Sequence, residues 1–270
     1  MRVLVTGGAG FIGSHVVHRF VRAGHDVLAI DNFDFSYGAP YGAAYAKNIS
    51  YRFDELIPTV RLERCDLTEG ARLASLLGRF QPDCIVHLAC LPLVSTATRN
   101  LELARTSMMT GLLQLLEIAS ALPSLGRLVY VSSSMVYGDF AEDPMPESGP
   151  TVPVNVYGGL KLAGEIAAKS YLRQAGTEVV IVRPSAVYGP GDVHGRVVQL
   201  FCQQAIAGER LRIANGRDVA MDFTFVDDIA DGLCLAATHP AAAGETFNMT
   251  RGEAHSLVDL AMMIRSRLPG

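Results

Sequence analysis

Residues 3–15, VLVTGGAGFIGSH, join a short apolar run to a glycine-rich turn and to an amphipathic segment that continues to Ala23. In a strand-turn-helix unit of this kind, one glycine permits the tight turn, one lets the backbone approach a pyrophosphate, and one lets the helix pack on its strand. The helix N-terminus also offers free N–H groups and a positive dipole end to phosphate. We therefore expect Gly7, Gly10 and Gly13 to form a dinucleotide-binding turn.

A carboxylate follows this unit at the spacing that a dinucleotide site needs. The apolar segment 26–30 reads as a second strand and ends on Asp31. Dinucleotide-binding folds place an acid roughly 20 residues past the glycines, where it binds the adenosine ribose hydroxyls. A carboxylate there would repel a 2′-phosphate, so the sequence predicts NAD rather than NADP. Glycine clusters alone are weak evidence, but strand, helix and acid in this order favour a cofactor site over a plain turn.

Bulk composition narrows the class of protein. The 270 residues are 49% hydrophobic and carry a formal net charge of −4, which gives no reason to expect nucleic acid or an anionic membrane as a partner. No apolar run reaches membrane-spanning length, and no signal-peptide pattern precedes the first strand. Five dispersed cysteines without zinc-type spacing predict free thiols in the cytoplasm and no metal site. The preference for Arg over Lys suggests a GC-rich bacterial genome.

Strand-like and helix-like segments then alternate along the chain. We expect further strands at 60–65, 84–89 and 127–131, and helices at 69–80, 101–122, 157–175 and 256–267, with Thr68 capping the first of these helices. Residues 32–58 show no clean period and predict an irregular connection. This order is typical of an α/β fold, a Rossmann-type doubly wound parallel sheet. We expect an NAD-binding domain over 1–180, with strand returns near 222–248, and a substrate lobe over 181–270.

Chemistry-bearing residues follow the strand at 127–131. That strand ends on SSSMVYG (132–138), and Tyr157 and Lys161 stand four residues apart at the start of a helix, on one helical face. A tyrosine hydroxyl titrates near 10, too high for a base at neutral pH. A nearby lysine and the positive nicotinamide ring are expected to lower the pKa of Tyr157, so that it moves a proton while a serine holds the substrate oxygen.

Together these motifs resemble the extended short-chain dehydrogenases/reductases, in the family of NAD-dependent sugar-nucleotide epimerases and dehydratases. The resemblance runs from Met1 to about Arg267, through TGGAGFIG (6–13), DN (31–32), CDL (65–67), HLA (87–89), SSSMVYG, Y-x-x-x-K, RP (183–184), YGPG (188–191) and DFTFVDD (222–228). It implies that Asp66 and Leu67 edge the adenine, and that Lys161 also binds the nicotinamide ribose. The other cofactor residues that it implies are Phe11, Ile12, Asn32, Leu88, Ala89, Pro184 and Val187.

The resemblance also assigns the catalytic serine and the class of reaction. Counting back from Val136, the family's catalytic Ser/Thr position is Ser133. In 4,6-dehydratases of this family an Asp-Glu pair follows it, but here those positions are Ser134 and Met135, which cannot do that chemistry. Ser133, Tyr157, Lys161 and NAD match the set that epimerases need. The sequence thus predicts an epimerase, most simply at C4 of a nucleotide-activated sugar, through transient oxidation to a keto-sugar and hydride return.

Two other interpretations stay open. An NAD-dependent oxidoreductase or ketoreductase could use the same residues on a related sugar or polyol, and it would consume added NADH. The second of these alternatives is a non-catalytic NAD-binding regulatory protein, but such a protein would have no physical need for Lys161.

Departures from the family pattern fall where relatives contact substrate. The usual Asn before Val-Tyr-Gly-Pro is Ala186, and the usual Arg before Asp-Phe is Met221, both at positions that touch the substrate diphosphate. An Asn three residues before Gly111 is replaced by Met108. Losing an Arg–phosphate pair forfeits a strong, often bidentate interaction, so we expect compensation or a different substrate handle. The compensating candidates are Arg196, Arg212 and Arg217, and the candidate substrate-contacting residues are Ser134, Met135, Ala186, Arg196, Arg217 and Met221.

The end of the chain and its helices give two last expectations. After the helix at 256–267 relatives continue through further substrate-contacting segments, so the substrate lobe is expected to be shortened. The helices at 101–122 and 157–175 match those through which relatives form homodimers, and both carry apolar residues at helical spacing. The expected partners are therefore a small-molecule substrate and a second copy of the chain.

Overall fold

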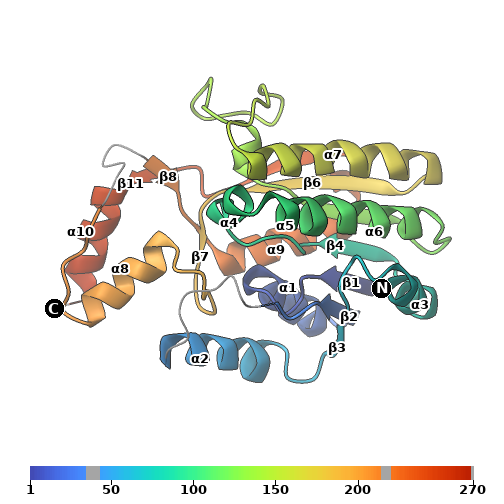
Figure 1. Cartoon of the computed structure of the whole chain (residues 1–270), viewed down its shortest axis with the longest axis horizontal. Coiled ribbons are helices and arrows are strands. Elements are labelled where there is room, and N and C mark those ends of the chain that lie inside the picture. The colour runs from blue at the N-terminus through green and yellow to red at the C-terminus, as the bar shows by residue number, and fades with distance from the viewer. Residues whose placement is uncertain (35–42, 214–219, 269–270) are drawn as a thin grey trace.

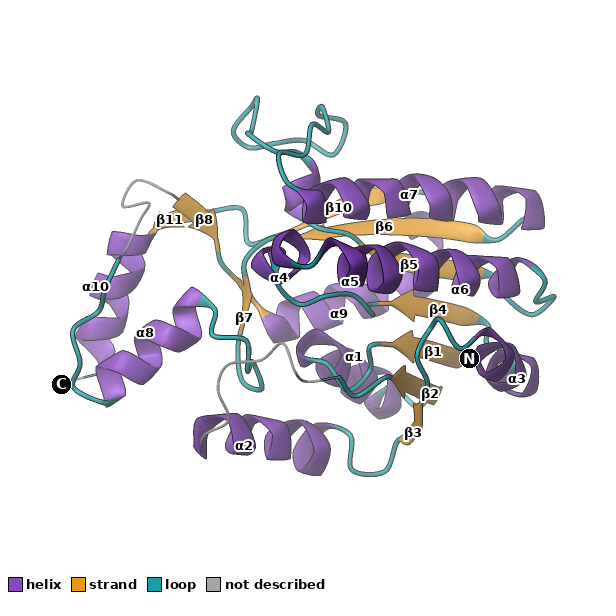
Figure 2. Ribbon diagram, viewed as in Figure 1, coloured by secondary structure: helices purple, strands orange, loops and turns teal. Residues whose placement is uncertain are grey.

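The computed structural model describes residues 1–34, 43–213 and 220–268. Its centre is a seven-stranded parallel sheet in the order β10-β6-β5-β4-β1-β2-β3, with helices on both faces (Figures 1 and 2). The strands are β1 (Arg2–Thr6), β2 (Asp26–Asp31), β3 (Arg61–Arg64), β4 (Cys84–His87), β5 (Arg127–Val131), β6 (Glu178–Pro184) and β10 (Thr246–Met249). This arrangement confirms the predicted Rossmann-type doubly wound sheet.

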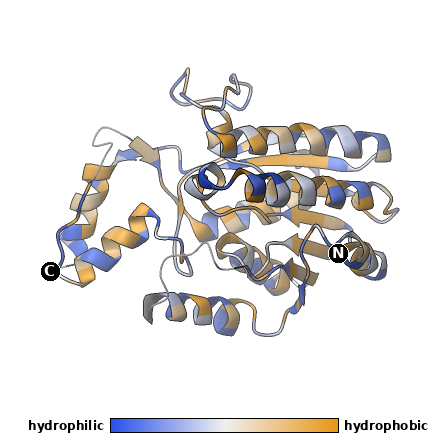
Figure 3. Cartoon of the chain, viewed as in Figure 1, coloured by the Kyte–Doolittle hydropathy of each residue, from blue (hydrophilic) through white to orange (hydrophobic). Residues whose placement is uncertain are grey.

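The central strands β1, β2, β4, β5 and β6 bury residues on both faces, which is why they read as continuous apolar runs, whereas the edge strands β3 and β10 are only partly buried. On one face, Val3 and Val5 of β1 pack with α1 (Phe11–Arg22) and α9 (Val226–Thr238). On the other face, Leu4 packs with α3 (Gly70–Phe80), α6 (Gly111–Ser120) and α7 (Val156–Ala175). Hydrophobic residues accordingly concentrate in the strands and on the inner sides of the helices (Figure 3).

The helices and strands after β6 form two groups, one packed on the sheet and one apart from it. Helix α9 and strand β10 return to the sheet, whereas α8 (Val197–Ile206), β8 (Ala220–Asp222), β11 (Ala254–Ser256) and α10 (Leu257–Arg267) gather at the left in Figure 1. Between the two groups, β7 (Val187–Tyr188) pairs with β9 (Thr224–Phe225). The second group encloses an apolar cluster whose buried members are Phe201, Phe223, Leu260 and Ile264.

Local capping explains several helix boundaries. Asn155 accepts a hydrogen bond from the Gly158 N–H and starts α7, and Ser256 forms a capping box with Asp259 at α10. The predicted cap at Thr68 is wrong: its hydroxyl donates to Asp66 Oδ1, and α3 begins only at Gly70. The N-cap position belongs to Glu69, so Thr68 lies one residue too early to cap α3.

Two segments differ from the predicted elements. The stretch predicted to be irregular contains α2 (Ala43–Ser50) and a π-helical turn, Tyr51–Leu56. The single helix predicted at 101–122 is instead α5 (Leu101–Arg105), a second π-helical turn (Thr106–Thr110) and α6, and a further helix, α4 (Val94–Arg99), precedes it. π-Turns are frequent at functional sites, and both of these turns contribute a residue to the pocket described below.

All five cysteines lie in the described residues and are free thiols, two of them buried and three partly buried. Within the three described stretches, no helix combines the length and apolarity needed to cross a membrane.

Candidate active site

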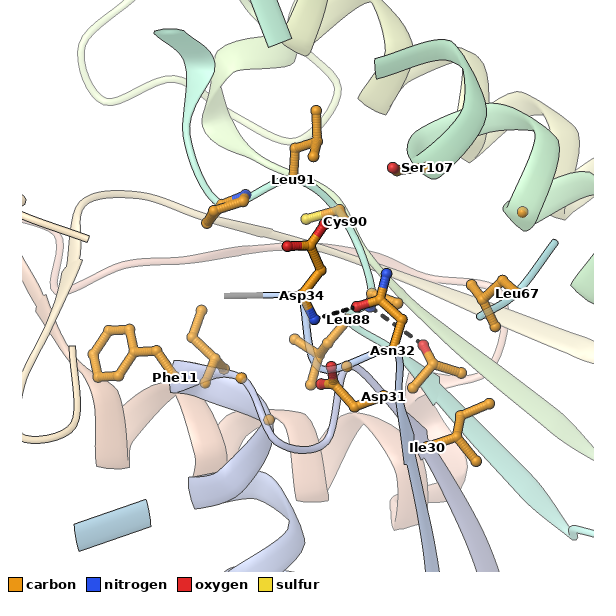
Figure 4. A pocket seen from close by; sticks show the side chains of 18 of the residues that line it. Phe11, Ile30, Asp31, Asn32, Asp34, Leu67, Leu88, Cys90, Leu91 and Ser107 are labelled. Carbon is orange, nitrogen blue, oxygen red and sulfur yellow. Dashed lines mark hydrogen bonds between the residues drawn. The ribbon is translucent and has the colours of Figure 1, made fainter. Parts of the chain in front are cut away.

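A pocket opens beyond the carboxyl ends of β1, β2 and β4, where a doubly wound sheet is expected to bind its ligand (Figure 4). Among its lining residues are most of those predicted to bind the cofactor: Gly7, Gly10, Phe11, Ile12, Gly13, Asp31, Asn32, Asp66, Leu67, Leu88 and Ala89. Residues far apart in the sequence therefore meet at one edge of the sheet.

The glycine-rich turn leaves the N-terminus of α1 open. Gly10 occupies the N-cap position, and no side chain caps the helix. A Cβ on Gly13 would lie 2.0 Å from the Gly7 carbonyl oxygen, so α1 can approach the turn this closely only without a side chain there. The free N–H groups and positive dipole end of α1 fit the diphosphate of a dinucleotide.

Carboxylates line the pocket beside the glycine-rich turn. Asp31 accepts hydrogen bonds from the N–H groups of Ala9 (3.1 Å) and Phe33 (2.9 Å), while burial raises its pKa. Asn32 donates to Asp66 Oδ2 at 2.9 Å, one of the dashed lines in Figure 4. Burial raises the pKa of Asp66, but hydrogen bonds from Thr68 and Asn32 outweigh it and leave this pKa lowered. Asp31 fits the ribose of an adenosine, where its charge disfavours a 2′-phosphate, and Asp66 stays the residue expected along the edge of the adenine.

The head of α7 carries the predicted catalytic pair. Lys161 is buried, its Nζ donates to the Val131 carbonyl at 2.8 Å, and it lies 5.8 Å from the centre of the Tyr157 ring. Ser133 lies at the end of β5, where its Oγ accepts from the Met135 N–H at 3.2 Å and caps a short 3₁₀ turn, Ser134–Val136. A Cβ on Gly158 would meet the Met135 carbonyl oxygen at 2.4 Å, so α7 lies directly against this serine-bearing turn.

The prediction that neighbouring charge lowers the pKa of Tyr157 is wrong for the protein alone. Burial raises this pKa well above its ordinary value, with the Cys90 thiol adding to the effect and Arg196 opposing it. The ammonium of Lys161 is bound to the Val131 carbonyl, and desolvation of the phenolate outweighs the attraction. A positive nicotinamide ring remains the expected source of any lowering.

A buried polar network, not foreseen from the sequence, holds this region in place. Glu165 on α7 forms an ion pair with Arg183 on β6 (2.7 Å) and accepts from Ser132 Oγ (2.5 Å). Arg183 also donates to the Tyr137 hydroxyl (2.8 Å), which in turn donates to Asn248 on β10 (2.7 Å). The network joins both flanks of the serine turn to α7 and the sheet. Glu165 follows Lys161 by one helical turn, which was the signal available in the sequence.

The remaining predicted residues lie elsewhere. Pro184 ends β6 and Val187 lies in β7; neither lines the pocket, and neither do Tyr157 and Lys161. Ala186 and Met221 pack against the apolar cluster of α8 and α10, and Met108 is buried in a small cluster that includes Tyr157.

The three candidate arginines separate in the structure. Arg196 lines the cofactor pocket, bonded to Asp192 (2.9 Å) and to the Pro92 carbonyl (3.1 Å). Arg212 is exposed, and Arg217 lies outside the described residues. Pocket residues that the sequence reasoning missed include Arg52, Cys90, Leu91, Pro92, Ser107 and His194.

Comparison with known proteins agrees with this geometry. Residues 3–250 match the model of the NAD dependent epimerase/dehydratase family. The chain is 34% identical to a UDP-glucose 4-epimerase of Mycolicibacterium smegmatis over 93% of this chain and 78% of the relative. It also superposes, over 98% of its length, on the NAD complex of the Thermus thermophilus UDP-glucose 4-epimerase (27% identity, TM-score 0.81, 83% of that chain).

A third relative carries a different sugar. The structure of Bacillus cereus UDP-glucuronic acid 4-epimerase, in complex with UDP-glucuronic acid and NAD, is 28% identical with a TM-score of 0.86 over 98% of this chain and 82% of that one. The predicted family, fold and cofactor are thereby confirmed: the chain belongs to the NAD dependent epimerase/dehydratase family.

Proposed function

We propose that this NAD-dependent epimerase inverts C4 of a UDP-activated hexose or hexuronic acid. The observation that carries the proposal is the head of α7, where Tyr157 and buried Lys161 are packed against the turn that bears Ser133. The two positions after Ser133 hold Ser134 and Met135, so the acid-base pair of a dehydratase is missing there. UDP and C4 are inferred from the names of the relatives.

The residues of the chain have distinct roles in this reaction. NAD, when bound, supplies reversible removal of hydrogen from the sugar carbon. Tyr157 accepts the proton of the C4 hydroxyl and returns it, Ser133 holds the same oxygen, and Lys161 supplies positive charge beside the phenol. Burial raises the pKa of Tyr157 in the protein alone, so we propose that bound cofactor and substrate lower it before the tyrosine acts as a base.

The elements around α8 and α10 are proposed to form the substrate lobe. Ala186 and Met221 give it an apolar wall. We propose that an arginine of this part of the chain, Arg196, Arg212 or Arg217, compensates at the substrate diphosphate. Arg196 is supported by its place in the cofactor pocket, beside the Phe11 ring at 5.6 Å.

The assembly is proposed to be a homodimer through α6 and α7. Ile166 and Tyr171 of α7 are exposed, at 60% and 43%, which is a high exposure for large apolar side chains. Light scattering at micromolar concentration checks this, and a monomer there would contradict it.

The decisive experiment is a product assay with no added cofactor. UDP-glucose, UDP-galactose, UDP-glucuronic acid and UDP-galacturonic acid are incubated separately with purified protein, and the products are separated by anion-exchange chromatography. We expect one 4-epimer pair to interconvert from both directions. In a separate incubation with NADH and a keto-sugar, net consumption of NADH would instead support the oxidoreductase alternative. Release of neither product, with NAD bound, would favour the non-catalytic one.

A further inference from the structure

Arg52 lies on the π-helical turn after α2 and is fully buried. Its guanidinium connects two loops that are distant in the sequence. Nε donates to the Gly191 carbonyl at 2.7 Å, and Nη1 donates to the Ala9 carbonyl in the glycine-rich turn at 3.2 Å. The arginine thus joins the cofactor-binding turn to the loop that follows β7.

The third nitrogen of this guanidinium, Nη2, has no hydrogen-bond partner among the described residues. It is buried, and within the described stretches Asp192 and Asp31 affect Arg52 through their charge rather than through a bond to this nitrogen. Burial lowers its pKa to about 10, while Asp192 and Asp31 oppose that change, so the group stays charged at neutral pH. Buried cations are normally paired, and a buried donor without an acceptor costs free energy. Nη2 is therefore suited to bind an anionic ligand.

The neighbourhood indicates which anion this is. Arg52 lines the same pocket as Gly10, Phe11 and Asp31, and it bonds the carbonyl of Ala9, one residue before the N-cap of α1. The uncapped N-terminus of α1 faces this pocket, and the diphosphate is the anionic part of a dinucleotide. We propose that Arg52 binds the diphosphate of NAD through Nη2, in addition to its two structural bonds. This inference rests on NAD as the cofactor and not on the identity of the sugar.

A purely structural role makes a different prediction, which a neighbouring residue allows us to test. Asn48 on α2 accepts a hydrogen bond from the Gly191 N–H at 3.0 Å and so anchors the same loop without a positive charge. If Arg52 acted only by holding this loop, Asn48→Ala would reproduce the effect of substituting Arg52. A diphosphate ligand instead requires the guanidinium itself.

The test measures binding to the full-length protein, stripped of cofactor, by isothermal titration calorimetry for ADP-ribose and by NMR for adenosine. We expect Arg52→Met to weaken ADP-ribose binding by roughly 10- to 100-fold, as for one charge-assisted hydrogen bond, and Arg52→Lys to weaken it less. Adenosine affinity should stay within about twofold of wild type, because adenosine carries no phosphate, and Asn48→Ala should behave like wild type with both ligands.

Other outcomes overturn the proposal. Unchanged binding of both ADP-ribose and UDP by Arg52→Met, an equal loss with adenosine, or a matching loss in Asn48→Ala would each leave Arg52 with a structural role only. UDP binding to NAD-saturated protein distinguishes the diphosphate of NAD from that of the substrate. A loss of affinity confined to UDP would assign Arg52 to the substrate diphosphate instead. If the variants fail to fold, a structure of wild-type protein with NAD decides, because Nη2 must then lie about 3 Å from a phosphate oxygen.

Discussion

At the carboxyl ends of β5 and β6, buried polar side chains bind one another, whereas the elements after β7 enclose apolar side chains. Glu165, Arg183 and Ser132 are each less than a tenth exposed and are joined by hydrogen bonds of 2.5–2.9 Å. In the second region Phe201 and Phe223 are buried, and Met221 packs against them. Hydrogen-bonded groups require one geometry, but apolar contacts tolerate many. Substitutions should therefore be most harmful at the catalytic edge of the sheet and mildest around α8 and α10.

The largest effect is expected at Tyr157. Tyr157→Phe removes the proton-transferring hydroxyl but keeps the ring, so turnover should fall by roughly 10³-fold while the NAD affinity changes little. Epimerisation rates and calorimetric NAD titration measure the two quantities. A variant that retains a tenth or more of wild-type turnover would show that another group moves the proton.

The polar network is expected to contribute strongly to stability. Glu165→Gln leaves Arg183 buried without its charge partner, and the free energy of unfolding should fall by about 3 kcal/mol. Urea denaturation measures this, and the double variant Glu165→Gln/Arg183→Met is the control, because removing both charges should recover part of the loss. A single-variant loss below about 1 kcal/mol would mean that the network is not tightly coupled.

The two serines after β5 should differ. Ser133→Ala is expected to lower turnover by roughly 10- to 100-fold, since its hydroxyl is proposed to hold the sugar oxygen. Ser134→Ala should have little effect. Steady-state rates of both variants are the measurement, and a more damaged Ser134→Ala would place the catalytic serine one residue later.

A pH dependence should arise at His87 beside the catalytic edge. Burial, with the charge of Lys161, lowers the pKa of His87 to about 3, and its Nδ1 lies 2.8 Å from Thr6 Oγ1. The unfolded chain binds this proton near pH 6.5, so stability is lost as the pH falls below 6.5 towards 3. At pH 5 the loss is about 2 kcal/mol. Urea denaturation at pH 7 and at pH 5 measures the free energy of unfolding of the wild type and of His87→Gln. The variant should lose about 2 kcal/mol less between the two pH values. An equal loss in both proteins would contradict the prediction.

The smallest effect is expected in the apolar region. Met221→Arg places a guanidinium where relatives are expected to hold the substrate diphosphate, so UDP should bind up to about 10-fold more tightly. Met221→Leu is the matched control and should leave UDP affinity unchanged. Weaker or unaltered UDP binding by Met221→Arg would place the diphosphate away from β8. The apolar region around α8 and α10 would then not be the site of the substrate diphosphate.

Elements with a strong local pattern were foreseen most accurately. The apolar run before the glycines is β1, the segment that ends on Asp31 is β2, and Tyr157 and Lys161 stand on the first turns of α7. Most of the predicted cofactor residues line one pocket, because parallel strands bring their carboxyl ends to the same edge. Burial is less visible from a sequence, and in the protein alone it raises the pKa of Tyr157, against the lowering expected from Lys161; the lowering expected from the nicotinamide ring stays a prediction.

The amino-acid sequence by itself determined the strands, the open glycine-rich turn, the acid at the end of β2 and the Tyr-Lys spacing, because each depends on residues that are close to one another in the sequence. Only the tertiary structure decided the partners of Arg52 and Arg183. Arg183 forms an ion pair with a carboxylate on α7, which compensates its burial. Arg52 donates hydrogen bonds to the carbonyls of Ala9 and Gly191, and its Nη2 has no hydrogen-bond partner in the described part of the chain. One arginine is therefore a structural cation and the other a proposed ligand site, because long-range neighbours supply a hydrogen-bonded carboxylate to Arg183 only.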